Sequence, residues 1–183
     1  MNEPTTVLTD YALAVVSAFL GFRLIAYSRF WSLAFLALAV GALLGGTWHG
    51  FWQSDLLWKA TTLAVGVTSF GMVGASAYAL TPGKLRNGLI ALAAVKLLAY
   101  LAWMLRHDDF IWVVADTGIA LLIVAAVHVW RFNGWILAGV AVSVLAGLAQ
   151  ASGLALHERF NHNDLYHVLQ IAAMFLFYRG VRR

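Results

Sequence analysis

The chain contains seven apolar segments, each long enough to cross a lipid bilayer as a helix. A helix needs about 20 apolar residues to span roughly 30 Å of hydrocarbon. Of the 183 residues, 62% are hydrophobic and only 11% are charged, whereas a soluble domain carries about 25% charged residues. The sequence therefore predicts an all-α polytopic membrane protein in which residues 1–183 form a single domain. The expected transmembrane spans are 7–27, 30–52, 55–80, 84–106, 109–130, 133–156 and 163–180.

The distribution of basic residues predicts the orientation of these helices. Seven spans put the termini on opposite faces, and only Arg106 and Arg159 fall in connections on the N-terminal side. The positive-inside rule then puts the C-terminus in the cytoplasm and the N-terminus outside. The net charge of +4 reflects this topology, so we expect no nucleic-acid partner. The basic residues on the C-terminal side are Arg23, Arg29, Lys84, Arg86, Arg131, Arg179, Arg182 and Arg183.

Ionisable side chains inside the spans are the candidates for function, because each costs at least about 2.5 kcal/mol at the centre of a helix. The chain has no Cys, so a thiolate nucleophile and thiolate metal ligands are excluded. Asp55 opens the third span, with Lys59 one turn deeper on the same face, and the two could pair. Lys59 could also extend to the interface. Lys96 and Asp116 lie deeper, where they form either a structural ion pair or part of a site.

Four histidines have simpler structural explanations. His49 ends the second span between two tryptophans and could be an interfacial side chain. His107, with the two aspartates that follow it, is expected in a solvated loop, as is His157. His128 precedes Trp130 and Arg131, which predicts an interfacial position.

The stretch "NDLYH" at the start of the seventh span is harder to explain by structure alone. Asn163 and Asp164 precede His167 by four and three residues, so the three share one face of a helix. One of the first two can cap the helix. His167 then lies about one turn inside the bilayer without a structural explanation.

Two chemistries fit these residues. Zinc takes three or four nitrogen or oxygen ligands, and His49, His167 and a carboxylate would supply them while leaving a position for water. Such a metal lowers the pKa of its water to about 7 and produces a hydroxide for hydrolysis. Alternatively, His167 with Asp164 or Asp55 forms a metal-free acid–base pair or a proton relay.

These residues resemble a superfamily of seven-helix membrane hydrolases that includes the alkaline ceramidases and the progestin and adipoQ receptors. "GGTWHGF" resembles its second-helix segment with His49, Asp55 stands near its Asp, and "NDLYHVLQ" resembles its seventh-helix His-x-x-x-His pair. The resemblance implies three zinc-binding histidines. Asn163 replaces the first of that pair, so His162 would take its place from a position before the helix begins.

The sequence is also similar to a group of small bacterial seven-helix proteins without assigned function. The similarity lies in the segments "GGTWHGF", "LLWK", "HDDF" and "FNHNDLYH". This resemblance implies relatives and a bacterial inner-membrane location, but no chemistry.

Together these features lead us to expect a zinc-dependent hydrolase of an amide or ester bond in a lipid-like substrate. The expected metal ligands are His49 and His167, with Asp164 or His162 as a third. Alternatives are a small-solute binding protein or proton-coupled transporter, and a haem-binding electron-transfer protein with two axial histidines. The expected catalytic residues are Asp55 as a base, Lys59 or Lys96 as an anion stabiliser, and Asp116.

Overall fold

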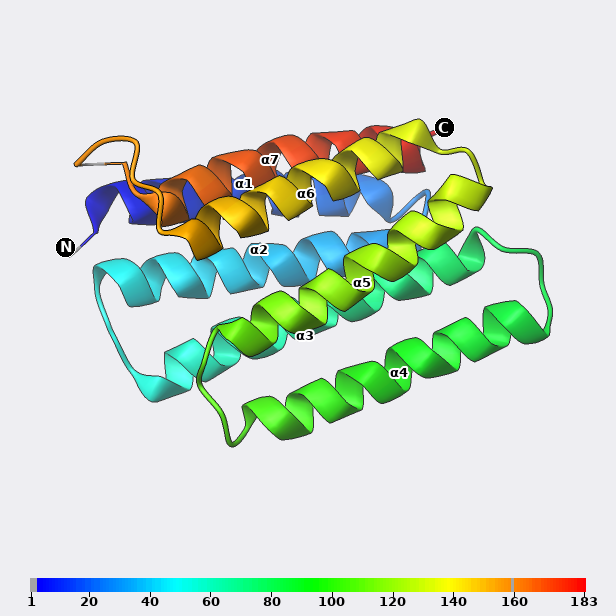
Figure 1. Cartoon of the computed structure of the whole chain (residues 1–183), viewed down its shortest axis with the longest axis horizontal. Helices are drawn as coiled ribbons and strands as arrows, with labels where there is room; N and C mark the ends of the chain where they lie inside the picture. The colour runs from blue at the N-terminus through cyan, green and yellow to red at the C-terminus, as the bar shows by residue number, and fades with distance from the viewer. Residues whose placement is uncertain (1–2, 159) are drawn as a thin grey trace.

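The structure, a computed structural model, describes residues 3–158 and 160–183, and these fold into seven α-helices (Figure 1). The all-α prediction is confirmed, and each helix corresponds to one predicted span. Arg159, which entered the orientation argument, lies outside the described residues. The helices are α1 (Pro4–Leu24), α2 (Arg29–Gly50), α3 (Asp55–Tyr78), α4 (Lys84–Met104), α5 (Ile111–Trp130), α6 (Gly134–Ser152) and α7 (His162–Val181).

Six of the seven helices, α1 to α6, are long and apolar enough to cross a membrane. Helix α7 has comparable length, with 20 residues, but carries more polar side chains. It packs against α1 and α6 and turns Asp164, His167 and Gln170 into the bundle, where they are buried.

The helix ends follow local sequence signals. The side chains of Ser28, Ser54 and Asn133 accept hydrogen bonds from backbone N–H groups of the first turns of α2, α3 and α6, as N-cap residues do. Helix α6 is followed by Gly153 as its C-cap residue, whose φ of 67° is left-handed and favours glycine. Short connections follow, so sequential helices run antiparallel and the termini lie at opposite ends of the bundle (Figure 1).

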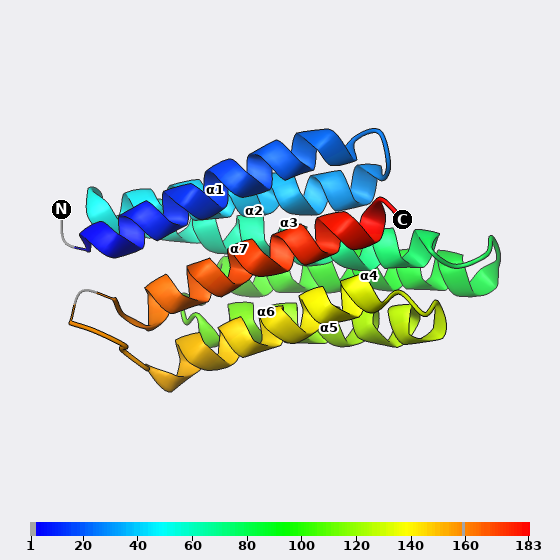
Figure 2. The same cartoon turned by 90° about the horizontal axis from the view of Figure 1, so that it is seen from above.

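Six helices form a closed ring, and α4 lies outside it. Around the ring, α1 packs on α2, α2 on α3, α3 on α5, α5 on α6, α6 on α7 and α7 on α1. Helix α4 packs against α3 from outside (Figures 1 and 2). The first and last helices therefore close the ring side by side.

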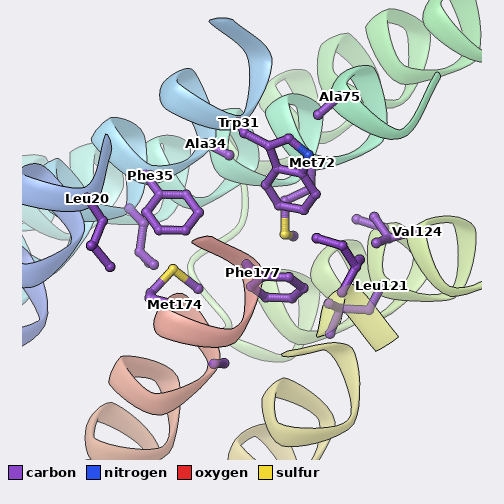
Figure 3. Close-up of a cluster of buried hydrophobic side chains, with 14 of the residues drawn as sticks. Leu20, Trp31, Ala34, Phe35, Met72, Ala75, Leu121, Val124, Met174 and Phe177 are labelled. Atoms are coloured by element: carbon purple, nitrogen blue, oxygen red, sulfur yellow. The ribbon is translucent and has the colours of Figure 1, made fainter. Parts of the chain in front are cut away.

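Large apolar side chains fill the ring toward the end that carries the C-terminus. The Trp31 ring stacks on Phe177, with their centroids 5.3 Å apart. Side chains of α1, α2, α3, α5 and α7 meet around this pair (Figure 3). Packing at this end leaves the interior near the N-terminus to polar groups.

His128 lies in the last turn of α5, at the end of the span as expected, but its side chain points into the bundle. It is 5% exposed, because it follows Leu121 and Val124 on the helix face that points into the bundle. Within the described part of the chain, neither ring nitrogen has a hydrogen-bond partner.

Gly71 lies where α3 contacts α2, and Gly88 lies on the open surface of α4. The same substitution should therefore have opposite effects at these two glycines. A Cβ on Gly71 would lie 2.8 Å from the backbone nitrogen of Ala34, whereas a Cβ on Gly88 would meet nothing within 4 Å. We expect Gly71→Ala to lower the free energy of unfolding by about 1–3 kcal/mol through overpacking. Gly88→Ala should raise it by about 0.4–1 kcal/mol. Denaturant titration in detergent, followed by circular dichroism, measures both, and equal effects would contradict the close helix contact.

Candidate functional site

A polar cavity of about 260 Å³ lies inside the ring at the end that carries the N-terminus. Side chains from α1, α2, α3, α6 and α7 and from the residue before α5 line it. The polar and aromatic residues of its wall are Asp10, His49, Trp58, Thr61, Phe110, Gln150, His162, Asn163, Tyr166 and His167.

The deepest polar contact in this cavity joins the first and last helices. His167 Nε2 lies 3.1 Å from Asp10 Oδ1, and both side chains are less than 10% exposed. His167 Nδ1 lies 3.0 Å from the hydroxyl of Thr9, so both ring nitrogens are engaged. Asp10 also packs closely against α2. Gly46 of α2 allows this close packing, because a Cβ there would lie 2.9 Å from Asp10 Cβ.

The contacts of Thr9 indicate where the protons of this group lie. Its hydroxyl is 3.1 Å from the carbonyl oxygens of Thr5 and Thr6 and has only one proton to donate. When that proton goes to a carbonyl, His167 Nδ1–H donates to Thr9 Oγ1. A proton carried by either Asp10 Oδ1 or His167 Nε2 would then face the other atom across 3.1 Å. The two residues thus form a proton-sharing pair.

Asp164 is committed to the start of α7. Its Oδ2 accepts from the backbone N–H of Asn161 at 2.8 Å, while the Asn161 side chain accepts from the N–H groups of Asn163 and Asp164. This capping box satisfies donors that the helix start leaves free. Asp164 does not line the cavity, although its Oδ1 lies 3.4 Å from the Thr9 hydroxyl. His162 is the first residue of α7, so it lies within the helix that was expected to begin after it.

His49 forms a second histidine–carboxylate pair nearer the mouth of the cavity. Its Nδ1 lies 3.2 Å from Glu3 Oε2, and its side chain is 17% exposed. No described residue hydrogen-bonds to Nε2, which leaves that nitrogen available to a molecule in the cavity. Glu3 is the N-cap residue directly before α1, so the carboxylate partners of both cavity histidines come from the N-terminal segment that contains α1.

The structure does not bring the four residues predicted to be catalytic into the cavity. Asp55 is exposed at the start of α3. Lys59 pairs with Asp108 and donates to the carbonyl oxygen of Met104 at 3.0 Å, so it fastens the α4–α5 connection to α3. Its partner Asp108 has a side chain that is 64% exposed, as expected for a solvated loop, and the alternative pair of Lys59 with Asp55 is not formed.

Lys96 and Asp116 form the ion pair that was one of their two predicted roles. Lys96 Nζ lies 2.5 Å from Asp116 Oδ1, with the side chains 13% and 6% exposed. The pair joins α4 to α5 and does not line the cavity, because α4 lies outside the ring. Its position indicates a structural role.

The described side chains do not fit the predicted zinc site. Of the four predicted ligands, Asp164 caps a helix and His167 has both nitrogens engaged. No group of three or more His, Asp or Glu among residues 3–158 and 160–183 could hold a metal ion. Axial ligation of haem by His49 and His167 would also need a free ring nitrogen on His167, and both are in contact with protein groups. Zinc and haem stay predictions from the sequence.

An apolar groove of about 210 Å³ adjoins the polar cavity. It runs between α5 and α6, and α7 forms its floor. Phe110, Gln150 and Tyr166 line both spaces. Gly118 and Gly147 in the groove have open space where a Cβ would stand. A polar compartment and an apolar one are therefore neighbours with a shared wall.

Sequence reasoning missed Asp10, Glu3 and Thr9. The first span was predicted to start at residue 7, which put Asp10 at its end, among the interfacial acids. Helix α1 starts at Pro4, so Asp10 lies two turns inside and is 3% exposed. Pro4 was the available signal, because proline favours the first position of a helix.

Comparison with known proteins yields one match. A family model described as "Family of unknown function (DUF6962)" matches residues 5–183. No curated protein and no solved structure matches the chain. The comparisons give no link to the alkaline ceramidase and receptor superfamily.

The Lys96–Asp116 pair predicts strong non-additivity in stability. Lys96→Met or Asp116→Leu alone leaves one buried charge without its partner, so each should lower the free energy of unfolding by about 3–5 kcal/mol. The double variant removes both charges and should lie within about 1 kcal/mol of the wild type. Denaturant titration in detergent measures the three variants. Additive losses in the double variant would mean that the two side chains do not pair.

Proposed function

The chain belongs to DUF6962, a family of unknown function, and from its own geometry we propose that it is a membrane-embedded hydrolase that cleaves an amide or ester bond in a lipid-like substrate. The carrying observation is the pairing of two cavity histidines with carboxylates beside an apolar groove. No step of the proposed reaction passes through a metal.

His49 is the proposed general base. A catalytic imidazole works best when a carboxylate fixes its orientation through one nitrogen and the other faces the reacting atoms. Glu3 Oε2 lies 3.2 Å from Nδ1 without hydrogen-bond geometry, so a small rotation would complete the contact, and His49 itself lines the cavity. His49 would take a proton from water as that water attacks the substrate carbonyl carbon, and the C–N or C–O bond then breaks.

The Asp10–His167 pair is the proposed acid. It holds one shared proton in a buried position, and this proton can pass to the leaving amine or alcohol. Asp10 Oδ2 is buried and has no hydrogen-bond partner among the described residues, so the pair would act on the substrate through the side of His167 and Asp10 that lines the cavity. The proton taken up by His49 restores the pair after product leaves.

The adjoining groove supports a lipid-like substrate. A molecule with its scissile bond in the polar cavity would extend its apolar part past Phe110 and Tyr166 into the groove between α5 and α6. The groove is mostly apolar, and each CH₂ that it buries contributes about 0.8 kcal/mol. Its position between two membrane-spanning helices suits a substrate that arrives from the bilayer.

We further propose that α7 also crosses the membrane, with the N-terminus outside and the C-terminus in the cytoplasm. The excess of Lys and Arg at the C-terminal end supports this orientation. The cavity would then open toward the outer face of the cell membrane.

The proton-sharing pair also supports a second candidate function, the proton-coupled binding or transport of a small polar solute. Ionisable groups buried in a membrane commonly serve as proton relays. The distinction is chemical, because a transporter releases its solute unchanged whereas a hydrolase releases two products.

The first experiment tests for hydrolysis. The full-length protein in detergent is incubated with N-acyl amides and acyl esters, and released fatty acid is measured by mass spectrometry. His49→Gln and His167→Gln should each lower kcat/KM by about 10²–10⁴-fold, the usual contribution of a positioned acid or base. His107→Gln is the matched control, because His107 stacks on Trp103 outside the cavity.

Two further results complete this test. Elemental analysis of the purified wild type, His49→Ala and His167→Ala proteins should find substoichiometric zinc in all three; stoichiometric zinc lost in both variants would replace the proposed route with a metal-dependent one. Absence of fatty acid release from every substrate, with proton-dependent solute binding that needs His167, would favour the transporter instead.

A second experiment addresses the groove. Gly147→Phe places a ring in the open space beside Gly147. It should lower kcat/KM for a long-chain substrate by about 50-fold, which corresponds to three methylenes excluded at about 0.8 kcal/mol each. A short-chain substrate that ends in the polar cavity should be unaffected. Gly88→Phe, on the open surface of α4, is the control. Equal loss with both chain lengths would mean that the groove does not hold the acyl chain.

A further inference from the structure

A hollow of about 470 Å³ lies at the C-terminal end of the bundle, opposite the polar cavity. We call it the arginine hollow; its wall consists of Phe175, Tyr178, Arg179, Arg182 and Arg183. The three arginines have spacings of three and one along the end of α7, so they share one face. Arg23 of α1 reaches the same place, since its Nε donates to the Tyr178 hydroxyl at 3.1 Å.

Aromatic rings hold the guanidinium groups in position. Arg179 lies over the Trp135 ring at 3.9 Å, and Arg183 lies over the same ring at 5.4 Å. Arg182 lies 5.3 Å from the ring centroids of both Tyr27 and Tyr178. Stacking uses the face of a guanidinium and leaves its N–H edges available; Arg182 Nη1 donates one of these N–H groups to the Tyr178 hydroxyl at 3.1 Å and keeps the others. The hollow therefore presents oriented donors before any ligand is bound.

No carboxylate side chain neutralises these arginines. All eight Asp and Glu residues of the chain lie in the half of the bundle that is nearer the polar cavity, away from the arginine hollow. They are Glu3, Asp10, Asp55, Asp108, Asp109, Asp116, Glu158 and Asp164. The ion pairs formed by the described residues all involve those acids. Four guanidinium groups are thus gathered without a counter-ion from the protein's side chains.

We propose that the arginine hollow binds the phosphodiester headgroup of an anionic phospholipid. Paired N–H groups of a guanidinium match two phosphate oxygens, which makes Arg the preferred residue for phosphate recognition. Tyr and Trp are typical of the membrane interface, where lipid phosphates lie, and basic pockets beside transmembrane helices bind anionic headgroups. Phe175 is 52% exposed and offers an apolar wall to the adjoining acyl chains. This proposal does not depend on the proposed hydrolysis.

Lipid binding to the full-length protein in a zwitterionic detergent tests the proposal. Phosphatidylglycerol and phosphatidylcholine with the same acyl chains are titrated, and bound lipid is measured by native mass spectrometry. The wild type should bind phosphatidylglycerol more tightly. Each Arg→Gln change should lower that affinity about fivefold, and the triple variant of Arg179, Arg182 and Arg183 about 100-fold.

A matched triple variant separates the hollow from general charge. The control triple variant combines Lys84→Gln, Arg86→Gln and Arg131→Gln and removes the same charge from the same end of the bundle. It should leave affinity for phosphatidylglycerol within about twofold of wild type, because none of these three residues lines the hollow. Circular dichroism checks the fold of both triple variants. The single variant Arg183→Gln changes one exposed residue only, so a loss of lipid affinity in it does not come from misfolding.

Three results would overturn the proposal. They are equal loss of affinity in the two triple variants, unchanged affinity in the variant of the hollow, and equal binding of the two lipids by the wild type. Inorganic phosphate serves as a competitor, because both a lipid headgroup and free phosphate could bind the arginines through phosphate oxygens. It should not displace phosphatidylglycerol at equal concentration; displacement would identify a site for free phosphate and contradict the lipid assignment.

Discussion

The contact between Asp10 and His167 is the interaction on which the site depends. Inside a bundle without bulk water, an ionisable group has to find its partner within the protein. Helix α1 provides Asp10 and α7 provides His167, so their 3.1 Å contact also fastens the two helices that close the ring. Thr9 extends the contact from His167 Nδ1 toward Asp164. The same group that favours closure of the ring thus places a shared proton at the inner wall of the cavity.

The division of the interior into two ends follows from the sequence of each helix. Apolar side chains such as Trp31 and Phe177 fill one end, while the carboxylates and most interior histidines gather at the other. At the basic end, arginines contact aromatic rings instead of carboxylates, as Arg179 does with Trp135. The protein therefore has one end rich in proton donors and acceptors and one end rich in fixed positive charge.

The sequence predicted the number and approximate limits of the helices well, because hydrophobicity over about 20 residues is a strong and local signal. It also predicted that His49 and His167 would face one cavity. It failed where the outcome depended on tertiary packing. The partner of Lys59 lies 49 residues away in a loop, and no local spacing connects them. Asp10 was missed because an error of three residues at the start of α1 changes its depth by about 4.5 Å.

The closure of the ring by its first and last helices sets the order in which the protein can be completed. Of the seven helices, α1 is synthesised first and α7 last, and Asp10 and His167 are 157 positions apart in sequence. Until α7 arrives, the carboxyl group of Asp10 faces the growing bundle without its histidine. Five helices are synthesised between the two halves of the pair, so the site forms only after α7 has been made, and a chain truncated before α7 lacks it altogether.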